Sequence, residues 1–221
     1  MGCAGEVPPR FEVVDRRVGD RTPRSAECDD VDDARCLLPW PSNTYAELDP
    51  STETGLRLAV AVNVLNGRDD PSSLRLADGF SRVSPLLAHF PAPLAQETLE
   101  NGISLILVQH DHPDRGSTVP LRVETISLED GRTLLLADPM RVLEPNADYL
   151  VVVTDSLVHE DGARVLPTRG TSLTLGLAEP ASQAEADRVG DHAPSRAALS
   201  EAHIEPTTGV RLWDFTTRSA A

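Results

Sequence analysis

The sequence predicts a mainly β domain, an antiparallel sandwich with a few short helices, and two kinds of pattern support this prediction. Asp-Gly pairs stand at 130–131 and 161–162, each between apolar runs. An Asp-Gly pair accepts the positive φ angles of a tight hairpin turn, so each pair predicts two adjoining antiparallel strands. A β-branched run, Tyr149–Thr154, comes after a Pro-Asn-Ala-Asp turn and predicts a further strand.

The other elements are predicted from apolar periodicity and from residues that break it. Alternating apolar residues predict a strand over Leu56–Val64. Proline is favoured at the first helical position, so Pro85 predicts a helical turn over 85–90. Two Ala-rich, β-poor stretches predict helices over 181–189 and 194–203. The remaining expected strands cover 103–108, 119–128, 133–137, 148–155, 163–166, 171–177 and 210–217.

The domain organisation is predicted from composition along the chain. Residues 1–27 are polar and rich in proline and arginine, which predicts a flexible tether. Residues 28–217 are expected to form the sandwich, with a helical insertion at about 180–204, and residues 218–221 a tail. The apolar positions predict a core of Leu58, Val60, Leu105, Leu107, Val123, Leu135, Tyr149, Val151, Val153, Leu173, Trp213 and Phe215.

Charge and composition argue against several classes of partner. The chain has 35 acidic and 20 basic side chains, a formal net charge of -15, and no lysine. Such a charge disfavours nucleic acid and anionic membrane surfaces, because both bind clustered cations. Aromatic residues make up only 4% of the chain, which disfavours a carbohydrate-stacking platform. No apolar run is long enough for a membrane-spanning helix, so membrane attachment is expected only through a lipid anchor.

The three cysteines suggest export. In a bacterial lipoprotein signal, the apolar segment is followed by a sequence like the Gly-Cys-Ala-Gly around Cys3, and the cysteine carries the lipid. The alternative is that Cys3 is a chance cysteine. Cys28 and Cys36 bracket a seven-residue loop rich in aspartate. A disulfide between them would contribute about 2–3 kcal/mol and would suit an exported protein. The alternative is reduced thiols in a cytosolic protein.

One short segment has the composition of a metal site. His110 and His112, with Asp114 close by, are residue types that bind Zn²⁺ or Cu²⁺. Pro113 and Gly116 instead predict a solvated turn after the preceding strand. The sequence therefore makes these three residues weak metal candidates, and no cofactor is expected.

Two further groups have some of the features of a site. The segment around Ser81 is the closest match to a Gly-x-Ser-x-Gly nucleophile elbow, but Val83 occupies the place of the second glycine. Ser81 is therefore expected to make a hydrogen bond in a turn or at the start of a helix, and no catalytic residue is expected in the chain. The loop between Cys28 and Cys36 is either a Ca²⁺ site or a solvated loop, and its spacing of aspartates does not match an EF-hand. The aspartates are Asp29, Asp30, Asp32 and Asp33.

The tryptophans are expected to be structural. Trp213 and Phe215 are two residues apart on a predicted strand, so both side chains should point into the core. Trp40 stands between two prolines and is expected to plug one end of the sandwich.

Three segments together resemble a known family: Cys-Leu-Leu-Pro-Trp-Pro-Ser-Asn at 36–43, Asp-Gly-Phe-Ser-Arg-Val-Ser-Pro at 78–85 and Leu-Trp-Asp-Phe-Thr-Thr at 212–217. Over roughly residues 28–217 the chain resembles the N-terminal immunoglobulin-like region of bacterial surface or secreted virulence-factor lipase-like lipoproteins. The resemblance implies an immunoglobulin-like sandwich. It also implies export, either to the outer membrane or cell surface as a lipoprotein or by secretion.

In that family the catalytic triad lies in an α/β-hydrolase domain after this region, so the resemblance assigns this chain no catalytic residue. The expected function is a non-catalytic module that spaces or positions an enzyme or partner domain, in the same or a neighbouring protein. One alternative is the N-terminal fragment of an extracellular lipase or esterase. Another is an independent small-ligand or metal binder.

Overall fold

The computed structural model describes residues 31, 37–60 and 71–220, and these residues are mainly β. The expected tether over 1–27, the three cysteines and the four aspartates of the 29–35 loop lie outside the described residues. The strands are β1 (Ala46–Leu48), β2 (Leu56–Leu58), β3 (Leu86–Phe90), β4 (Ile103–Leu107), β5 (Thr118–Val119), β6 (Leu121–Ser127), β7 (Thr133–Pro139), β8 (Asp148–Thr154) and β9 (Gly209–Thr216).

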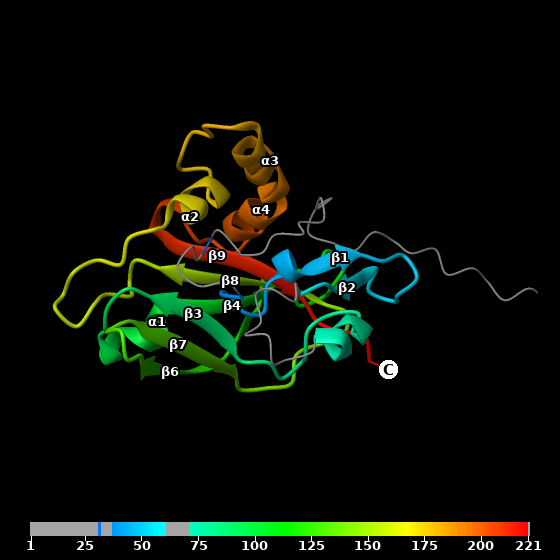
Figure 1. Cartoon of the computed structure of the whole chain (residues 1–221), viewed down its shortest axis with the longest axis horizontal. Helices are drawn as coiled ribbons and strands as arrows, with labels where there is room; N and C mark the ends of the chain where they lie inside the picture. Colours follow the sequence, from blue (N-terminus) through cyan, green and yellow to red (C-terminus); the bar gives the residue numbers. More distant parts are fainter. Residues whose placement is uncertain (1–30, 32–36, 61–70, 221) are drawn as a thin grey trace, which may run out of the picture.

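These strands form three antiparallel sheets, ordered β5-β4-β8-β9, β3-β7-β6 and β1-β2. The two larger sheets face each other, and helices lie over the outer side of the four-stranded one (Figure 1). None of the described helices is long and apolar enough to cross a membrane. The helices are α1 (Leu99–Gly102), α2 (Arg169–Thr174), α3 (Gln183–Asp191) and α4 (Ala193–Glu201), with 3-10 turns η1 (Asn43–Tyr45), η3 (Pro71–Leu76), η4 (Gln96–Thr98) and η5 (Pro206–Thr208).

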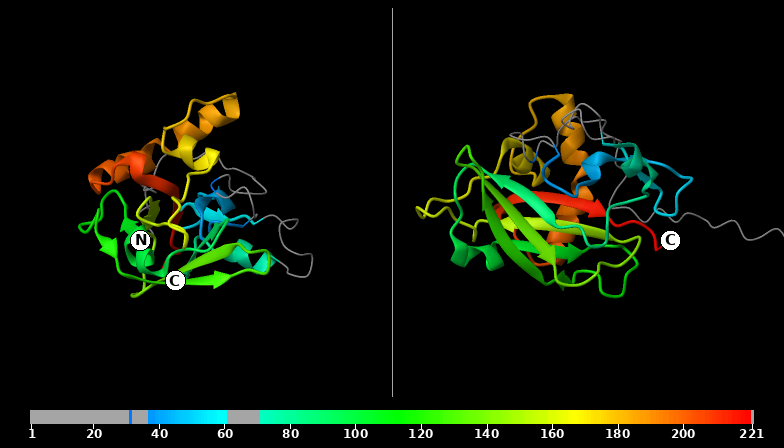
Figure 2. Two further views of the ribbon diagram at one scale, coloured as in Figure 1. Left: turned by 90° about the vertical axis from the view of Figure 1, so that its left-hand side faces the viewer. Right: turned by 60° about the horizontal axis from the view of Figure 1, so that its bottom comes forward.

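The four-stranded sheet is buried on both faces. Side chains such as Val151 and Trp213 point into the main core between the two sheets. On the opposite face, Leu150 and Leu212 pack against Leu199 of α4 in a second apolar cluster. The molecule therefore has three layers, sheet on sheet on helix, as the turned views also show (Figure 2). This double burial explains why β8 has a continuous apolar run over Tyr149–Val153 rather than clean alternation, and why every residue of β9 is buried.

Several local predictions are confirmed. Asp130-Gly131 joins β6 to β7 as expected, although only Gly131, at 80°, and not Asp130 has the positive φ that the predicted turn requires of both residues. The expected strands over 103–108, 133–137, 148–155 and 210–217 correspond to β4, β7, β8 and β9. Helices α3 and α4 occupy the two Ala-rich stretches. Of the twelve expected core residues all are buried except Val123, which is half-buried against the core.

The helical turn predicted over 85–90 is wrong, because these residues form β3. Leu86, Ala88 and Phe90 are buried at a spacing of two, and β3 pairs in continuous register with β7. Pro85 is compatible with both structures, since proline is tolerated at the start of a strand as well as of a helix. Pairing with β7 decides between them.

Two predicted strands are also wrong. Residues 171–174 belong to helix α2 and residues 175–177 follow its end. The first turn of α2 is capped, because the Thr168 hydroxyl accepts a hydrogen bond from the Thr171 N–H at 3.1 Å. Residues 163–166 contribute only an isolated bridge between Arg164 and Val158. Gly162 does adopt a φ of 80°, but its turn closes a loop instead of a two-stranded hairpin. For the strand predicted over Leu56–Val64, β2 ends at Leu58, and residues 61–64 lie outside the described residues.

Candidate functional site

The last strand continues into a segment that is held between two loops. Phe80 N–H donates to the Thr216 carbonyl at 2.9 Å, and Arg218 N–H donates to the Phe80 carbonyl at 2.8 Å. The two bonds form a parallel bridge between the 78–80 loop and the end of β9. They fix the direction in which the chain leaves the sheet.

The second loop, 144–147, grips the same segment from the other side. Thr217 N–H donates to the Ala147 carbonyl and Asn146 N–H donates to the Arg218 carbonyl, both at 3.0 Å. The fully buried Thr217 hydroxyl accepts from Ala147 N–H at 3.0 Å and donates to the Glu144 carbonyl at 2.7 Å. We name residues 78–80, 144–147 and 216–219 the C-terminal clamp. Arg218 and Ser219, the first two residues of the expected tail, are hydrogen-bonded to the domain, Arg218 through Phe80 and Asn146 and Ser219 through Asp78.

A buried polar group connects the clamp to the Pro-Ser-Asn segment. Asn43 Nδ2 donates to Asp214 Oδ2 at 3.0 Å, and Asn43 Oδ1 accepts from Thr216 N–H at 3.0 Å. The Thr216 hydroxyl donates to Asp148 Oδ1 at 2.7 Å. Asp148 and Asp214 are buried, at 3% and 1% exposure, so these hydrogen bonds offset part of the cost of removing both carboxylates from water. All three segments that carry the family resemblance therefore meet at the clamp.

Aromatic rings close the core beneath the clamp. The Trp40 ring meets the Phe80 ring edge-on with centroids 5.0 Å apart, and Phe80 meets Phe215 edge-on at 6.3 Å. Phe215 stacks on Tyr149 at 5.6 Å. Trp213 and Phe215 are core residues, as predicted, and Trp40 packs against the core from its rim. Phe80 thus joins the clamp to the apolar interior.

Gly79 allows the first loop to approach the segment closely. A Cβ atom at this position would lie 2.7 Å from the Arg218 nitrogen and 2.8 Å from the Thr217 carbonyl carbon. Both are backbone atoms, so neither can rotate away as a side chain would. The contact therefore requires glycine.

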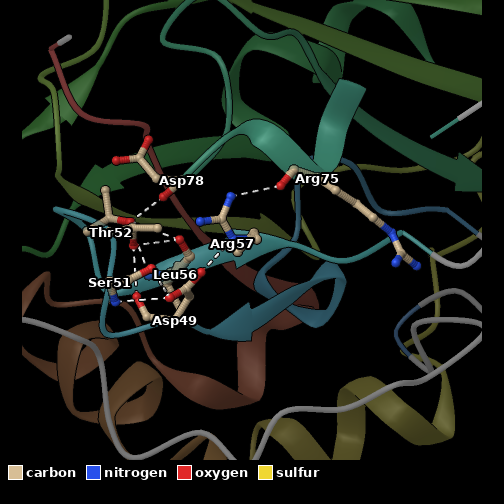
Figure 3. Close-up of polar contacts among 8 residues, drawn as sticks. Asp49, Ser51, Thr52, Leu56, Arg57, Arg75 and Asp78 are labelled. Carbon is tan, nitrogen blue, oxygen red and sulfur yellow. Dashed lines mark hydrogen bonds and ion pairs between the residues drawn. The ribbon is translucent and has the colours of Figure 1, made fainter. Parts of the chain in front are cut away.

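Asp78 is held from both directions. Its carbonyl accepts a hydrogen bond from the Thr54 hydroxyl, and its Oδ1 accepts from Ser219 N–H at 3.2 Å. The turn over 49–55 therefore supports the clamp from outside (Figure 3).

Within that turn, Asp49 organises the polar contacts shown in Figure 3. Asp49 Oδ1 accepts from Ser51 N–H at 2.9 Å and from the Ser51 hydroxyl at 2.5 Å, and Oδ2 accepts from Arg57 Nε at 2.5 Å. Arg57 also donates to the Arg75 carbonyl at 2.9 Å. The Ser51 hydroxyl first, and then Arg57, lowers the pKa of Asp49 from 3.8 to about 2.

The lowered pKa of Asp49 predicts that the 49–55 turn stabilises the folded state less at acid pH. The folded-state pKa of Asp49 is depressed, so its stabilisation is complete above the unfolded value of 3.8 and is lost as pH falls toward about 2. We expect the free energy of unfolding of the native chain to fall more steeply between these values than that of Asp49→Asn. Urea titrations of both proteins across this range measure the difference, and parallel curves would contradict it.

The Thr217 hydroxyl gives a second prediction. Thr217→Val keeps the shape but leaves the buried Ala147 N–H without its side-chain acceptor, so we expect the free energy of unfolding to fall by about 1–3 kcal/mol. Thr118→Val, at an exposed strand position, is the matched control and should change it by less than about 0.5 kcal/mol. Equal effects of the two variants in urea denaturation would show that the buried hydroxyl is not important to the clamp.

Ser81 and the weak metal candidates have no described hydrogen bond to the clamp. Ser81 is exposed, and its hydroxyl accepts from Val83 N–H at 3.4 Å, the turn contact expected from the sequence. His110 Nδ1 lies 2.8 Å from Asp111 Oδ1, and His112 Nδ1 accepts from Asp114 N–H at 3.1 Å.

The loop that carries these histidines comes after β4 and borders a pocket of about 310 Å³ beside the clamp. Asp111, His112 and Asn146 are among its lining residues, and Ala220 forms another part of the wall. Within the described part of the chain, no three His, Cys, Asp or Glu side chains lie close enough together to hold a metal ion. His110, His112 and Asp114 are therefore not gathered into a metal centre.

The whole chain matches no protein-family model and no curated protein. Among solved structures, it is similar to domains 1–6 of the surface layer protein SbsC, with 15% sequence identity and a TM-score of 0.28. That similarity covers 38% of this chain and 11% of the surface layer protein.

Proposed function

We propose that this chain is a non-catalytic, exported module of a bacterial surface lipoprotein that positions a neighbouring domain or partner through its C-terminal clamp. The single observation that carries the proposal is the clamp itself. Thr216, Thr217 and Ser219 are all at least nine-tenths buried, although they lie beyond the last core residue of β9. Backbone bonds from two separate loops hold this segment, which leaves its direction little freedom.

The fold supports a positioning role. Two apposed antiparallel sheets with an aromatic-lined end form a stiff body, and we propose that it is an immunoglobulin-like sandwich whose four-stranded sheet has gained a helical cover. The described polar network at the clamp joins carboxylate, amide and hydroxyl groups within the protein. In this proposal, these groups serve to hold the segment in place. Export is supported by the Gly-Cys-Ala-Gly segment around Cys3 and by the family resemblance.

The proposal is tested by fusing a small folded reporter domain directly after Ala221. In the native fusion we expect the reporter to tumble with the module, so its rotational correlation time should match that of the whole protein. Inserting about ten Gly and Ser residues before the reporter is the control that should uncouple the two. Gly79→Ala should also uncouple them by opening the clamp. Independent tumbling in the direct fusion would overturn the proposal.

The proposed export also predicts a disulfide between Cys28 and Cys36. The oxidised full chain should gain two protons in intact mass on reduction, and Cys28→Ser should abolish the change. Three free thiols in protein isolated from the envelope or medium of its native host would contradict the export proposal.

A further inference from the structure

Strand β6 ends the three-stranded sheet on one side, where α1 packs near it and Gln96 Nε2 donates to the Thr125 hydroxyl at 2.7 Å. Its seven residues pair with β7 in unbroken register, and no other described strand lies along its outer side (Figure 1). The opposite edge of the same sheet is covered, because Leu87 of β3 exchanges two backbone hydrogen bonds with Trp40, at 2.7 and 2.9 Å. A long, regular open edge without proline is a template for pairing with another strand.

The hydrogen bonds between β6 and β7 show which backbone groups of β6 point away from β7. Met140 N–H donates to the Pro120 carbonyl at 2.9 Å, just before β6 begins. Hydrogen-bonded positions alternate along an antiparallel pair, so the even-numbered residues of β6 bond to β7. The backbone groups of Leu121, Val123 and Thr125 therefore point to the open edge, and they have no hydrogen-bond partner among the described residues.

The exposed side chains along β6 follow an order that matches its own reverse, and within one chain Arg122 also pairs with Asp138 at 2.8 Å and with Glu124 at 3.3 Å. Along the outer face the order is Pro120, Arg122, Glu124 and Ile126: apolar, cationic, anionic, apolar. If a second antiparallel copy is placed with a twofold axis at Val123, every Arg122 faces Glu124 of the other copy. Every Pro120 then faces Ile126 of the other copy, a residue that is 48% exposed in the single chain. Opposite charges and apolar residues in facing positions stabilise cross-strand pairs.

Neighbouring registers lose this match. Moving the twofold axis to Thr125 would place Glu124 against Ile126 and Arg122 against Leu128. Moving it to Leu121 would place Arg122 against Pro120. The charge pattern therefore selects one register among those that the backbone alternation permits.

We propose that a second copy of this chain binds along β6, antiparallel and centred on Val123, so that the three-stranded sheets of two molecules become one continuous sheet. The partner strand is β6 of a second copy, because in an antiparallel pair each charge on β6 faces an opposite charge on the other β6. A twofold contact uses the same surface on both molecules, so the assembly closes as a dimer and does not extend into a fibre. The inference is independent of the positioning role of the clamp.

Sedimentation velocity of the full chain tests the dimer. The net charge of -15 on each copy opposes association, so the measurement is made at about 0.15 M salt, where the screening length is about 8 Å. Between about 1 and 200 µM, the native chain is expected to shift from monomer to dimer. A monomer throughout this range would overturn the proposal.

Charge reversal tests the register. Arg122→Glu and Glu124→Arg each create two like-charge contacts across the twofold axis, so each should raise the dimer Kd about tenfold or more. The double variant R122E/E124R exchanges the charges and should restore the Kd to within about threefold of the native value. Arg164→Glu, an exposed reversal away from β6, is the control and should leave the Kd unchanged. A dimer insensitive to the single reversals, or not restored by the double one, would overturn the proposed interface.

Val123→Pro tests the backbone contacts separately. It removes the N–H at the centre of the open edge and leaves the bonds to β7 in place, because those belong to even-numbered residues. We expect a folded monomer, with the circular dichroism spectrum of the native chain. A folded V123P variant that still dimerises would contradict the proposal. If this variant fails to fold, the charge reversals decide the question alone.

Discussion

Replacing Gly79 with alanine is expected to lower the free energy of unfolding by about 3 kcal/mol and to release the segment after β9. The added Cβ would lie 2.7 Å from the Arg218 nitrogen, well inside normal contact distance. Relief requires the 78–80 loop and the C-terminal segment to separate, which breaks the two backbone bonds to Phe80. Urea denaturation measures the loss of stability. Amide hydrogen exchange at Arg218 reports the opening of the clamp.

Gly190→Ala is the matched control for this substitution. Gly190 lies in α3, and no neighbouring atom lies within 4 Å of the position that an alanine methyl group would take, so the same change meets open space. Alanine in a helix is favoured over glycine, and the control should raise the free energy of unfolding by about 0.5–1 kcal/mol. A native-like Gly79→Ala protein with a protected Arg218 amide would show that the loop can yield and that glycine is not required.

Local patterns are sufficient to predict much of the β structure. The Asp130-Gly131 turn and the alternation on either side of it identify β6 and β7, because turn geometry and residue spacing act over a few residues. The element over 86–90 is different: Pro85 permits a helix or a strand, and only pairing with β7 decides. Residues 171–177 alternate like a strand, but the Thr168 cap begins a helix instead. These errors arise where long-range pairing or a cap outweighs spacing.

The sequence shows the motifs that form the C-terminal clamp but does not predict that they contact one another. The segments around Asn43, Gly79 and Thr217 are conspicuous as motifs, yet they are far apart in the chain. Asn43 and Asp214, which share a hydrogen bond, are 171 positions apart. No periodicity links such residues. The requirement for glycine at 79 likewise comes from the backbone of residues 217 and 218, which only the folded chain brings near.

Helix α4 adds a third layer to the two sheets of the sandwich. Leu199→Ala tests whether this helical layer folds together with the sheets. Leu199 of α4 is fully buried against the outer face of the four-stranded sheet, with Leu150 and Leu212 among its cluster. Removing its side chain leaves a cavity that rigid strands cannot fill. We expect the free energy of unfolding to fall by about 2–5 kcal/mol in a single cooperative transition.

Leu166→Ala is the control for that substitution, because the Leu166 side chain is 72% exposed and loses little contact when truncated. It should change the free energy of unfolding by less than about 0.5 kcal/mol. If Leu199→Ala were equally silent, or if α4 melted before the sheets in a separate transition, the helices would be an appended unit. A single transition with a large loss means that the second apolar cluster folds together with the sandwich. The continuous apolar run of β8 then has a physical reason, because its side chains pack into both apolar clusters.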